Sequence, residues 1–206
     1  MNLEPVRASY DVIDRFTAAL QKESAKRGRP MTCHEGCHYC CREPVWVERT
    51  EAEAMVATAP DPAGLRARTE AWWARFREIG GLAMPRPVER YMSALPAYRR
   101  ANLWCPFLVE RRCSSYAWRP AGCRLHIAVG PVSHCSDDAK RPGQLFMESP
   151  AHESAVVLRA HGELCQHAPR ALFQYDHLGV WLKEMLLGDK TRSESAQDLM
   201  VSSTDP

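Results

Sequence analysis

The sequence Cys33-His34-Glu35-Gly36-Cys37-His38-Tyr39-Cys40-Cys41 places four cysteines within nine residues. Pro30 and Pro44 bound this stretch and Gly36 lies inside it, which predicts a loop rather than a helix or a strand. Four thiolate donors so close together in a loop indicate metal ligation, because soft sulfur ligands suit thiophilic metals such as zinc and iron. We therefore expect this loop to organise the fold around a metal centre.

A second set of cysteines follows at wider spacing. Cys105, Cys113, Cys123 and Cys135 lie in residues 104–147, a segment that otherwise predicts little regular structure. A long irregular segment inside a compact domain needs something to hold it in place, and a metal centre can do so. We expect the loop of residues 33–41 to meet residues 105–135 over the metal.

Nine cysteines in 206 residues are too many for chance, and disulfides explain them poorly in a reducing cytosol. Buried free thiols are the alternative, since cysteine packs well as a small apolar residue. The grouping of eight cysteines favours ligation. Cys165 stands apart from them and is most simply a buried thiol.

Charge and hydropathy restrict the classes of binding partner. The chain carries 27 basic and 25 acidic residues, a balance too even for the positive field that non-specific nucleic-acid binding requires. No apolar run approaches the roughly 18 residues that span a bilayer, and the N-terminus lacks a basic and then apolar leader. We expect a cytoplasmic monomer that binds a metal ion or cluster, with a protein as a further partner or substrate.

Apolar periodicity predicts mainly helices. A helix is expected over residues 6–26, a second from a capping box of Thr50 and Glu53 to before Pro60, and a third over residues 61–79 with Trp72 and Trp73 in the core. Further helical segments are expected from residue 87, over residues 149–164 and over residues 178–188.

A short hairpin is the one β element that the pattern predicts. Residues 107–109 and 113–116 flank a charged turn at residues 110–112. The predicted fold is therefore a single, mainly α domain over residues 1–188 with a short β hairpin, an irregular chain held together by a cysteine-ligated metal centre. Its cysteine core covers residues 33–135 and its helical C-terminal part covers residues 149–188. Residues 189–206 are polar and predicted to be a disordered tail.

Cysteine spacing bears on the identity of the metal. Zinc ribbons use two close-spaced pairs, and only Cys37 and Cys40 have that spacing. Adjacent residues of an extended chain point to opposite sides, so Cys40 and Cys41 would not easily serve one ion, which suggests two sites or one cluster and a neighbouring cysteine. Iron-sulfur clusters accept varied spacings, and Arg119 and Arg124 near Cys123 suit an anionic thiolate centre. Iron-sulfur is favoured over zinc.

The same residues resemble a known family, the cysteine-cluster proteins whose domain is described as zinc- or iron-chelating and often labelled an iron-sulfur oxidoreductase. The matching motifs span residues 33–135 and are Cys33, Cys37, Cys40 and Cys41 followed by Arg42, Cys105-Pro106-Phe107-Leu108, Cys113-Ser114-Ser115-Tyr116, Arg119-Pro120, Cys123-Arg124 and Cys135. The resemblance implies a metal centre with a redox or protein-modifying role. Flagellin lysine methylases look similar in carrying a related cluster. His126 departs from the pattern and is a candidate extra ligand.

Two other readings remain open. Cys33, Cys37 and Cys40, with Tyr39, also resemble the signature of radical S-adenosylmethionine enzymes, but those enzymes need a series of buried strands that this sequence does not predict. A structural zinc module for protein or nucleic-acid interaction is the main non-enzyme alternative. Lys26-Arg27-Gly28-Arg29-Pro30 resembles a minor-groove hook, although a basic helix end closed by glycine explains it more simply.

A second metal face could form in the C-terminal part. His161 and Cys165 lie four residues apart on a predicted helix, with His167 close by, although a polar helix surface is the favoured interpretation. His34, His38 and His134 adjoin cluster cysteines and could ligate or donate to sulfur. No serine-histidine-aspartate pattern or phosphate loop indicates a hydrolase or a kinase.

Overall fold

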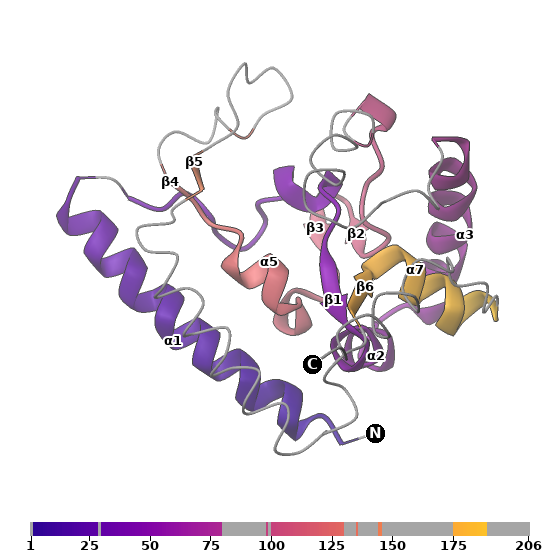
Figure 1. Ribbon diagram of the computed structural model, residues 1–206, viewed down its shortest axis with the longest axis horizontal. Helices are drawn as coiled ribbons and strands as arrows, with labels where there is room; N and C mark the ends of the chain where they lie inside the picture. The colour runs from indigo at the N-terminus through magenta and orange to yellow at the C-terminus, as the bar shows by residue number, and fades with distance from the viewer. Residues whose placement is uncertain are drawn as a thin grey trace, which may run out of the picture.

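The computed structural model describes residues 2–28, 30–79, 98, 100–129, 135, 144–145 and 175–188. Helices dominate these residues, and short antiparallel strand pairs accompany them (Figure 1). This confirms the predicted fold class, mainly α with a β hairpin. The segments predicted as helices from residue 87 and over residues 149–164, the group of His161, Cys165 and His167, and residues 189–206 lie outside the described residues.

Fourteen helices, turns and strands follow one another along the described residues. They are α1 (Glu4–Lys26), the 3₁₀ turn η1 (Tyr39–Arg42), β1 (Trp46–Glu48), α2 (Arg49–Ala57), α3 (Pro62–Glu78), β2 (Leu108–Val109), β3 (Arg112–Cys113), the 3₁₀ turn η2 (Tyr116–Trp118), α5 (Ala121–Leu125), β4 (Ala128–Val129), β5 (Gln144–Leu145), β6 (Tyr175–His177), α7 (Leu178–Leu182) and the π-helical turn η4 (Lys183–Leu187). The strands pair antiparallel as β1 with β6, β2 with β3, and β4 with β5.

Helix α1 runs along one side of the molecule with α5 beside it, and α3 and α7 lie on the opposite side (Figure 1). The buried face of α1 includes Val6, Tyr10 and Ile13, which recur at the spacing of successive helical turns. The helix ends at Lys26, where Gly28 adopts a φ of 69° and donates its N–H to the Ala25 carbonyl at 3.0 Å. This glycine-closed end confirms the helix-stop interpretation of the basic segment.

Helix α2 begins earlier than predicted. Arg49 is its first residue, and its capping box joins Glu48 and Glu51, the Glu48 N–H donating to Glu51 Oε2 at 3.0 Å. The expected box of Thr50 and Glu53 was therefore wrong. Strand β1 ends at Glu48 and leads directly into the helix, so the strand fixes the start of the helix and places a glutamate where a threonine was expected.

Helix α3 follows the sequence pattern closely. Asp61 caps it by accepting the Gly64 N–H at 2.9 Å, and Pro62 occupies the first turn. Trp72 and Trp73 are buried, at 4% and 8% exposure, which confirms their predicted core position. They form a cluster of buried side chains with Phe76, Tyr98 and Leu103.

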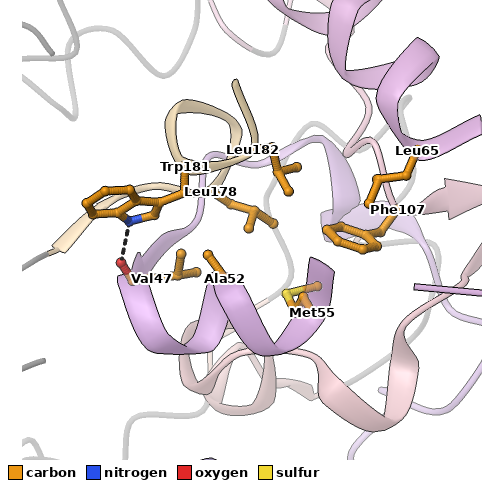
Figure 2. Close-up of a cluster of buried hydrophobic side chains, with 8 residues drawn as sticks. All are labelled: Val47, Ala52, Met55, Leu65, Phe107, Leu178, Trp181 and Leu182. Atoms are coloured by element: carbon orange, nitrogen blue, oxygen red, sulfur yellow. Dashed lines mark hydrogen bonds between the residues drawn. The ribbon is translucent and has the colours of Figure 1, made fainter. Parts of the chain in front are cut away.

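The largest core cluster unites segments that are far apart in the chain. Figure 2 shows its eight buried side chains, Val47, Ala52, Met55, Leu65, Phe107, Leu178, Trp181 and Leu182. The indole Nε1 of Trp181 donates to the Val47 carbonyl at 3.2 Å, and β1 pairs with β6 so that Trp46 lies opposite His177. Both strands have three residues, too few for an alternating pattern to reveal them in the sequence.

The predicted hairpin is present as β2 and β3, with Leu108 opposite Cys113. Its turn consists of Glu110 and Arg111 alone, whereas Arg112, expected in the turn, belongs to β3. Both turn residues have positive φ, 47° and 63°, as a two-residue turn between twisted strands requires.

Residues 104–147 were expected to be irregular outside the hairpin, and this was wrong for several described residues. Helix α5 and the β4–β5 pair lie there, elements of five residues or fewer that carry no periodic signal. At the C-terminal side, the expected helix is confirmed over α7 and η4 and ends at Gly188, whose φ is 74°. None of the helices in the described ranges is long and apolar enough to cross a membrane.

Candidate metal centre

Two backbone contacts bring the halves of the cysteine set together. The Cys105 N–H donates to the Cys41 carbonyl at 2.7 Å, and the Thr32 N–H donates to the Ala128 carbonyl at 3.1 Å. One contact lies at each end of the first cysteine loop. The expected meeting of residues 33–41 with residues 105–135 is therefore confirmed at the level of the backbone.

The first loop is a series of tight turns. Gly36 has a φ of 90°, a conformation that favours glycine, and the Cys37 N–H donates to the His34 carbonyl at 3.1 Å. Cys40 and Cys41 then lie in the 3₁₀ turn η1, and their thiols are hydrogen-bonded to each other. The expected extended geometry of this pair was wrong, because the turn bends the chain between the prolines.

Backbone N–H groups point at three of the sulfurs. The Ala128 N–H donates to Cys33 Sγ at 3.1 Å, the Phe107 N–H donates to Cys105 and the Ser115 N–H donates to Cys113. In the last two cases the donor lies two residues after the cysteine. Such bonds favour the thiolate form, and they orient sulfur ligands in metal sites. No sequence pattern marks these hydrogen bonds, because the donors are main-chain groups.

Burial opposes ionisation of the same thiols. All eight cysteines of the two groups are free and partly buried. Burial is the first cause that raises the pKa of five of them, namely Cys33, Cys105, Cys113, Cys123 and Cys135, and neighbouring cysteines raise it further. The backbone N–H bonds to Cys33, Cys105 and Cys113 act in the opposite direction and lower the pKa. Hydrogen bonding to Cys41 is the first cause that raises the pKa of Cys40, followed by burial. Thiols in this environment become thiolates when a cation replaces the protons.

Cys40 is the thiol that links the two sets. Its charge would raise the pKa of Cys33, Cys105, Cys113, Cys123 and Cys135. Such an effect falls off with distance, so all five thiols lie within electrostatic reach of Cys40. The structure therefore gathers thiols from both segments around one position in η1.

The two arginines proposed to balance thiolate charge occupy different places. Arg119 lowers the pKa of Cys33, Cys40, Cys113 and Cys123, as a cation near these sulfurs should. Arg124 is instead turned towards α1, where its buried guanidinium bonds the Asp14 carboxylate.

Further contacts hold Arg124 there. It donates to the carbonyls of Arg119 at 2.8 Å and Ala117 at 2.6 Å, and its guanidinium lies 4.1 Å from the centroid of the Tyr10 ring. These contacts position the segment between η2 and α5, so Arg124 supports the backbone that carries Arg119.

Glu51 is a buried residue next to the site that sequence reasoning missed. Its Oε1 accepts the Ala121 N–H at 2.7 Å, two residues before Cys123, and its carboxylate also accepts the Tyr10 hydroxyl. Burial raises the pKa of Glu51. The sequence shows only a glutamate early in a helix, where acidic residues are common, so no signal marked it.

The histidines in and beside the first loop make other contacts than the ligation predicted for them. Arg111 Nε donates to His38 Nε2 at 3.2 Å, and the His38 ring stacks on Tyr39. Burial, and then Arg111, lower the pKa of His38. His126, the candidate extra ligand, contributes its carbonyl to the Cys33 thiol at 3.8 Å, and His134 lies outside the described residues.

The donor set suits a thiophilic metal by its chemistry. Ser115 Oγ and Arg119 Nε are buried and have no hydrogen-bond partner among the described residues, which leaves two polar donors near the sulfurs for added acceptors. The thiols of the two segments are neighbours but do not yet form a ligand shell. In the described part of the chain, no three His, Cys, Asp or Glu side chains are arranged as ligands of one ion. Ligation would draw the thiols further together.

Comparison with known proteins agrees with the cysteine pattern. The model of the CxxCxxCC family, described as "Putative zinc- or iron-chelating domain", matches residues 32–143. No curated protein and no solved structure is significantly similar to the chain. The match covers more than half of the chain and includes all eight clustered cysteines. The chain therefore belongs to the CxxCxxCC family of zinc- or iron-chelating domains.

Proposed function

We propose that the eight clustered cysteines hold an iron-sulfur centre that serves electron transfer or a protein-modification reaction. The observation that carries the proposal is the gathering of thiols from two distant segments around Cys40, with backbone N–H groups already directed at sulfur. Family membership supports metal binding, with zinc or iron as the metal. An iron-sulfur cluster would supply one-electron chemistry when bound.

The surroundings of the thiols favour an anionic centre. Arg119 acts on four of the cysteines, and hydrogen bonds to sulfur tune the potential of thiolate-ligated clusters. Cys33, Cys105 and Cys113 each accept such a bond from the backbone. These groups would hold the sulfurs in place, offset their negative charge and keep water away from the buried members of the set.

A structural zinc module is the second candidate, and one observation favours it. The contacts of Cys41 with Cys105 and of Thr32 with Ala128 lie where residues 32–41 cross residues 105–128, so a redox-silent ion there would hold the two segments together. Such a module would bind a protein partner through its surface rather than catalyse a reaction.

Metal and sulfide analysis separates these candidates. The protein is purified without oxygen and without a metal-binding tag, and its iron, zinc and acid-labile sulfide are measured with an absorption spectrum. Iron with sulfide and a broad band at about 400 nm supports the iron-sulfur proposal. Stoichiometric zinc without visible absorbance supports the structural module, and absence of both metals contradicts both candidates.

A matched pair of variants ties the result to the site. Cys40→Ser should remove most of the metal, because Cys40 is the thiol that both segments share. Cys165→Ser makes the same chemical change outside the matched residues and should leave the metal content at the wild-type level. Equal metal content in the two variants would argue against ligation by the cluster.

A further inference from the structure

We infer that Ser115 and Arg119 together donate hydrogen bonds to an inorganic sulfide of the metal centre, an acceptor that belongs to the centre and not to the chain. The inference rests on the proposed function, that is, on the clustered cysteines holding an iron-sulfur centre. It adds two side-chain donors to the site and specifies the chemical class of atom that they bind. A zinc ion ligated by thiolates alone would bring no such acceptor.

The hydroxyl of Ser115 is a buried polar group that the described residues leave without a partner. The residue is 4% exposed, and its Oγ makes no hydrogen bond within the described ranges. A buried hydroxyl costs free energy unless it is hydrogen-bonded, so native proteins seldom leave one unpaired. The partner is therefore an added group, either a water molecule or an atom of the bound centre.

The backbone holds this hydroxyl beside a thiol. The Ser115 N–H donates to the Cys113 sulfur, and the Ser115 carbonyl accepts the Trp118 N–H at 2.9 Å. Both main-chain groups of the residue are thus fixed, and Oγ belongs to the same residue as the nitrogen that contacts sulfur. An atom bound next to the Cys113 sulfur would therefore lie near the hydroxyl, which can turn towards it by rotation about χ1.

Arg119 brings a second donor of the same kind. Its Nε is buried and also lacks a hydrogen-bond partner among the residues that the structure describes, while its guanidinium lies 4.2 Å from the centroid of the Tyr116 ring. Ser115 and Arg119 are the residues directly before and after the turn η2, so one short turn carries both donors. The charge of Arg119 also acts on Cys113, the thiol that Ser115 contacts.

An anion suits these two donors better than a water molecule does. An anion accepts from both, whereas a water molecule also needs acceptors for its own hydrogens. The Phe107 carbonyl beside Ser115 is already occupied, since it accepts the Ser114 N–H at 2.8 Å and the Ser114 hydroxyl at 2.9 Å. Hydrogen bonds to the sulfur atoms of a cluster stabilise its more negative, reduced form and so raise its reduction potential.

The matched pair of variants is Ser115→Ala and Ser114→Ala. The Ser114 hydroxyl has its partner in the Phe107 carbonyl, so its loss should lower the stability of the metal-free protein in urea. Ser115→Ala should leave the metal-free protein as stable as the wild type, because it removes a donor that is unpaired until the centre is bound. A loss of metal-free stability equal to that of Ser114→Ala overturns the inference, since water or the chain would then satisfy the hydroxyl.

The loaded proteins, purified without oxygen, should show the opposite order. Ser115→Ala should reduce by about 10-fold the chelator concentration that removes half of the iron, the effect expected for loss of a group that supports a metal centre. It should also lower the reduction potential, whereas Ser114→Ala should leave both quantities at the wild-type level. A Ser115→Ala cluster with wild-type potential and wild-type resistance to the chelator overturns the inference.

Arg119→Lys covers the case in which Ser115→Ala does not fold. Lysine keeps the positive charge but lacks the Nε–H, so the reduction potential should again fall, and Arg75→Lys at an exposed position of α3 should leave it unchanged. Equal potentials in these two variants overturn the inference. Wild-type protein without acid-labile sulfide contradicts the proposed function together with this inference, whereas an intact wild-type cluster and unaffected variants contradict this inference alone.

Discussion

In the part of the chain that the structure describes, Arg119 is a charged side chain that acts on four of the clustered cysteines. Its guanidinium lies 4.2 Å from the centroid of the Tyr116 ring, and it lowers the pKa of cysteines from both segments. Arg124, its close neighbour in sequence, bonds to Asp14 on α1 instead. Two arginines that look equivalent in the sequence thus have different partners, since Arg119 follows η2 and Arg124 lies on α5.

Replacement of Arg119 by glutamine should weaken metal binding. The variant keeps much of the side-chain volume but removes the positive charge near the sulfurs, and loss of a group that supports the ligands costs about 10-fold or more in metal affinity. If the metal is iron, the reduction potential should also fall, since a reduced cluster carries more negative charge. Competition with a chromophoric chelator measures the affinity.

The control for Arg119→Gln is Arg75→Gln. Arg75 is an exposed residue of α3 that pairs with Glu78, so this change removes the same charge outside the cysteine segments. Wild-type affinity in both variants would show that Arg119 has no part in holding the centre.

His177 should make stability sensitive to acid. It is buried among Trp72, Phe76 and Tyr98, and burial lowers its pKa to about 3. The unfolded chain takes up a proton below pH of about 6.5, whereas the folded protein does not. Stability should therefore fall as the pH drops from about 6.5 towards about 3, by up to roughly 1.4 kcal/mol for each pH unit.

The variant His177→Asn tests this prediction. Asparagine retains an acceptor for the Gly179 N–H, which His177 Nδ1 accepts at 3.1 Å, but it has no proton to gain. Urea unfolding between pH 4 and 7 should show a flatter pH dependence than in the wild type, and His34→Asn, a change at an exposed histidine, should not flatten it. Because acid also releases thiolate-bound metal, the variants are compared at each pH. Parallel curves for all three proteins would contradict the assignment.

At the scale of elements, Gly179 shows how packing overrides helix propensity. A Cβ at this position in α7 would lie 2.2 Å from the Trp72 side chain, so the indole of α3 fills the space that a methyl group would need. Alanine is the better helix former by about 1 kcal/mol, but overpacking of a well-filled core typically costs about 1–3 kcal/mol.

Because a Cβ 2.2 Å from the Trp72 ring is a severe overlap, the packing cost should lie at its upper end, about 3 kcal/mol, and Gly179→Ala should lower the free energy of unfolding by about 2 kcal/mol after the helix-propensity gain of about 1 kcal/mol. The matched control is Gly179→Ala in a Trp72→Leu background, because the ring atoms that the Cβ would meet are then absent and the change should cost less. Urea denaturation measures both. A Gly179→Ala protein as stable as the wild type would show that Trp72 moves aside without cost.

Long helices with clear caps could be predicted from the sequence, and short strands could not. Helices α1 and α3 have long periodic patterns and clear ends, at Gly28 and Asp61, and were predicted well. Strands β1 and β6 were missed because each exists only through its pairing with the other, across more than a hundred residues. The turn at Glu110 and Arg111 was predicted one residue too long, because neither residue is the glycine or asparagine that marks a two-residue turn.

At the scale of the whole molecule, the metal centre should contribute to folding. The thiol segments contact each other through few backbone bonds, and their buried thiols oppose one another's ionisation. Removal of the metal should lower the melting temperature by roughly 10 °C or more, because structural metal binding is worth many kcal/mol and each kcal/mol corresponds to about 2–4 °C in a protein of this size.

Hydrogen exchange gives the regional readout for metal removal. Protection should be lost in residues 32–42 and 105–129, whereas α3 should keep most of its protection through the Trp72 and Phe76 cluster. Re-addition of the metal should restore the melting temperature. A metal-free protein that melts cooperatively at the temperature of the loaded one would contradict a role of the centre in folding.

The candidate site was predictable in its composition and not in its geometry. The eight cysteines and Arg119 were proposed as site residues from motif and spacing, and their roles as ligands and as charge partner stay predictions. The N–H donors of Phe107, Ser115 and Ala128 and the buried Glu51 depend on tertiary contacts. Main-chain donors have no sequence signature, so only the folded chain reveals them.

The pairing of β1 with β6 has a consequence for the order in which the chain is made. The ribosome delivers all eight clustered cysteines before residues 175–187, which begin forty positions after Cys135 and supply Leu178, Trp181 and Leu182 to the core around Val47. During synthesis the thiols therefore emerge while the core behind Cys105 and Cys113 is still open to water. The nascent chain therefore exposes these thiols to metal, or to any oxidant, before its core is complete.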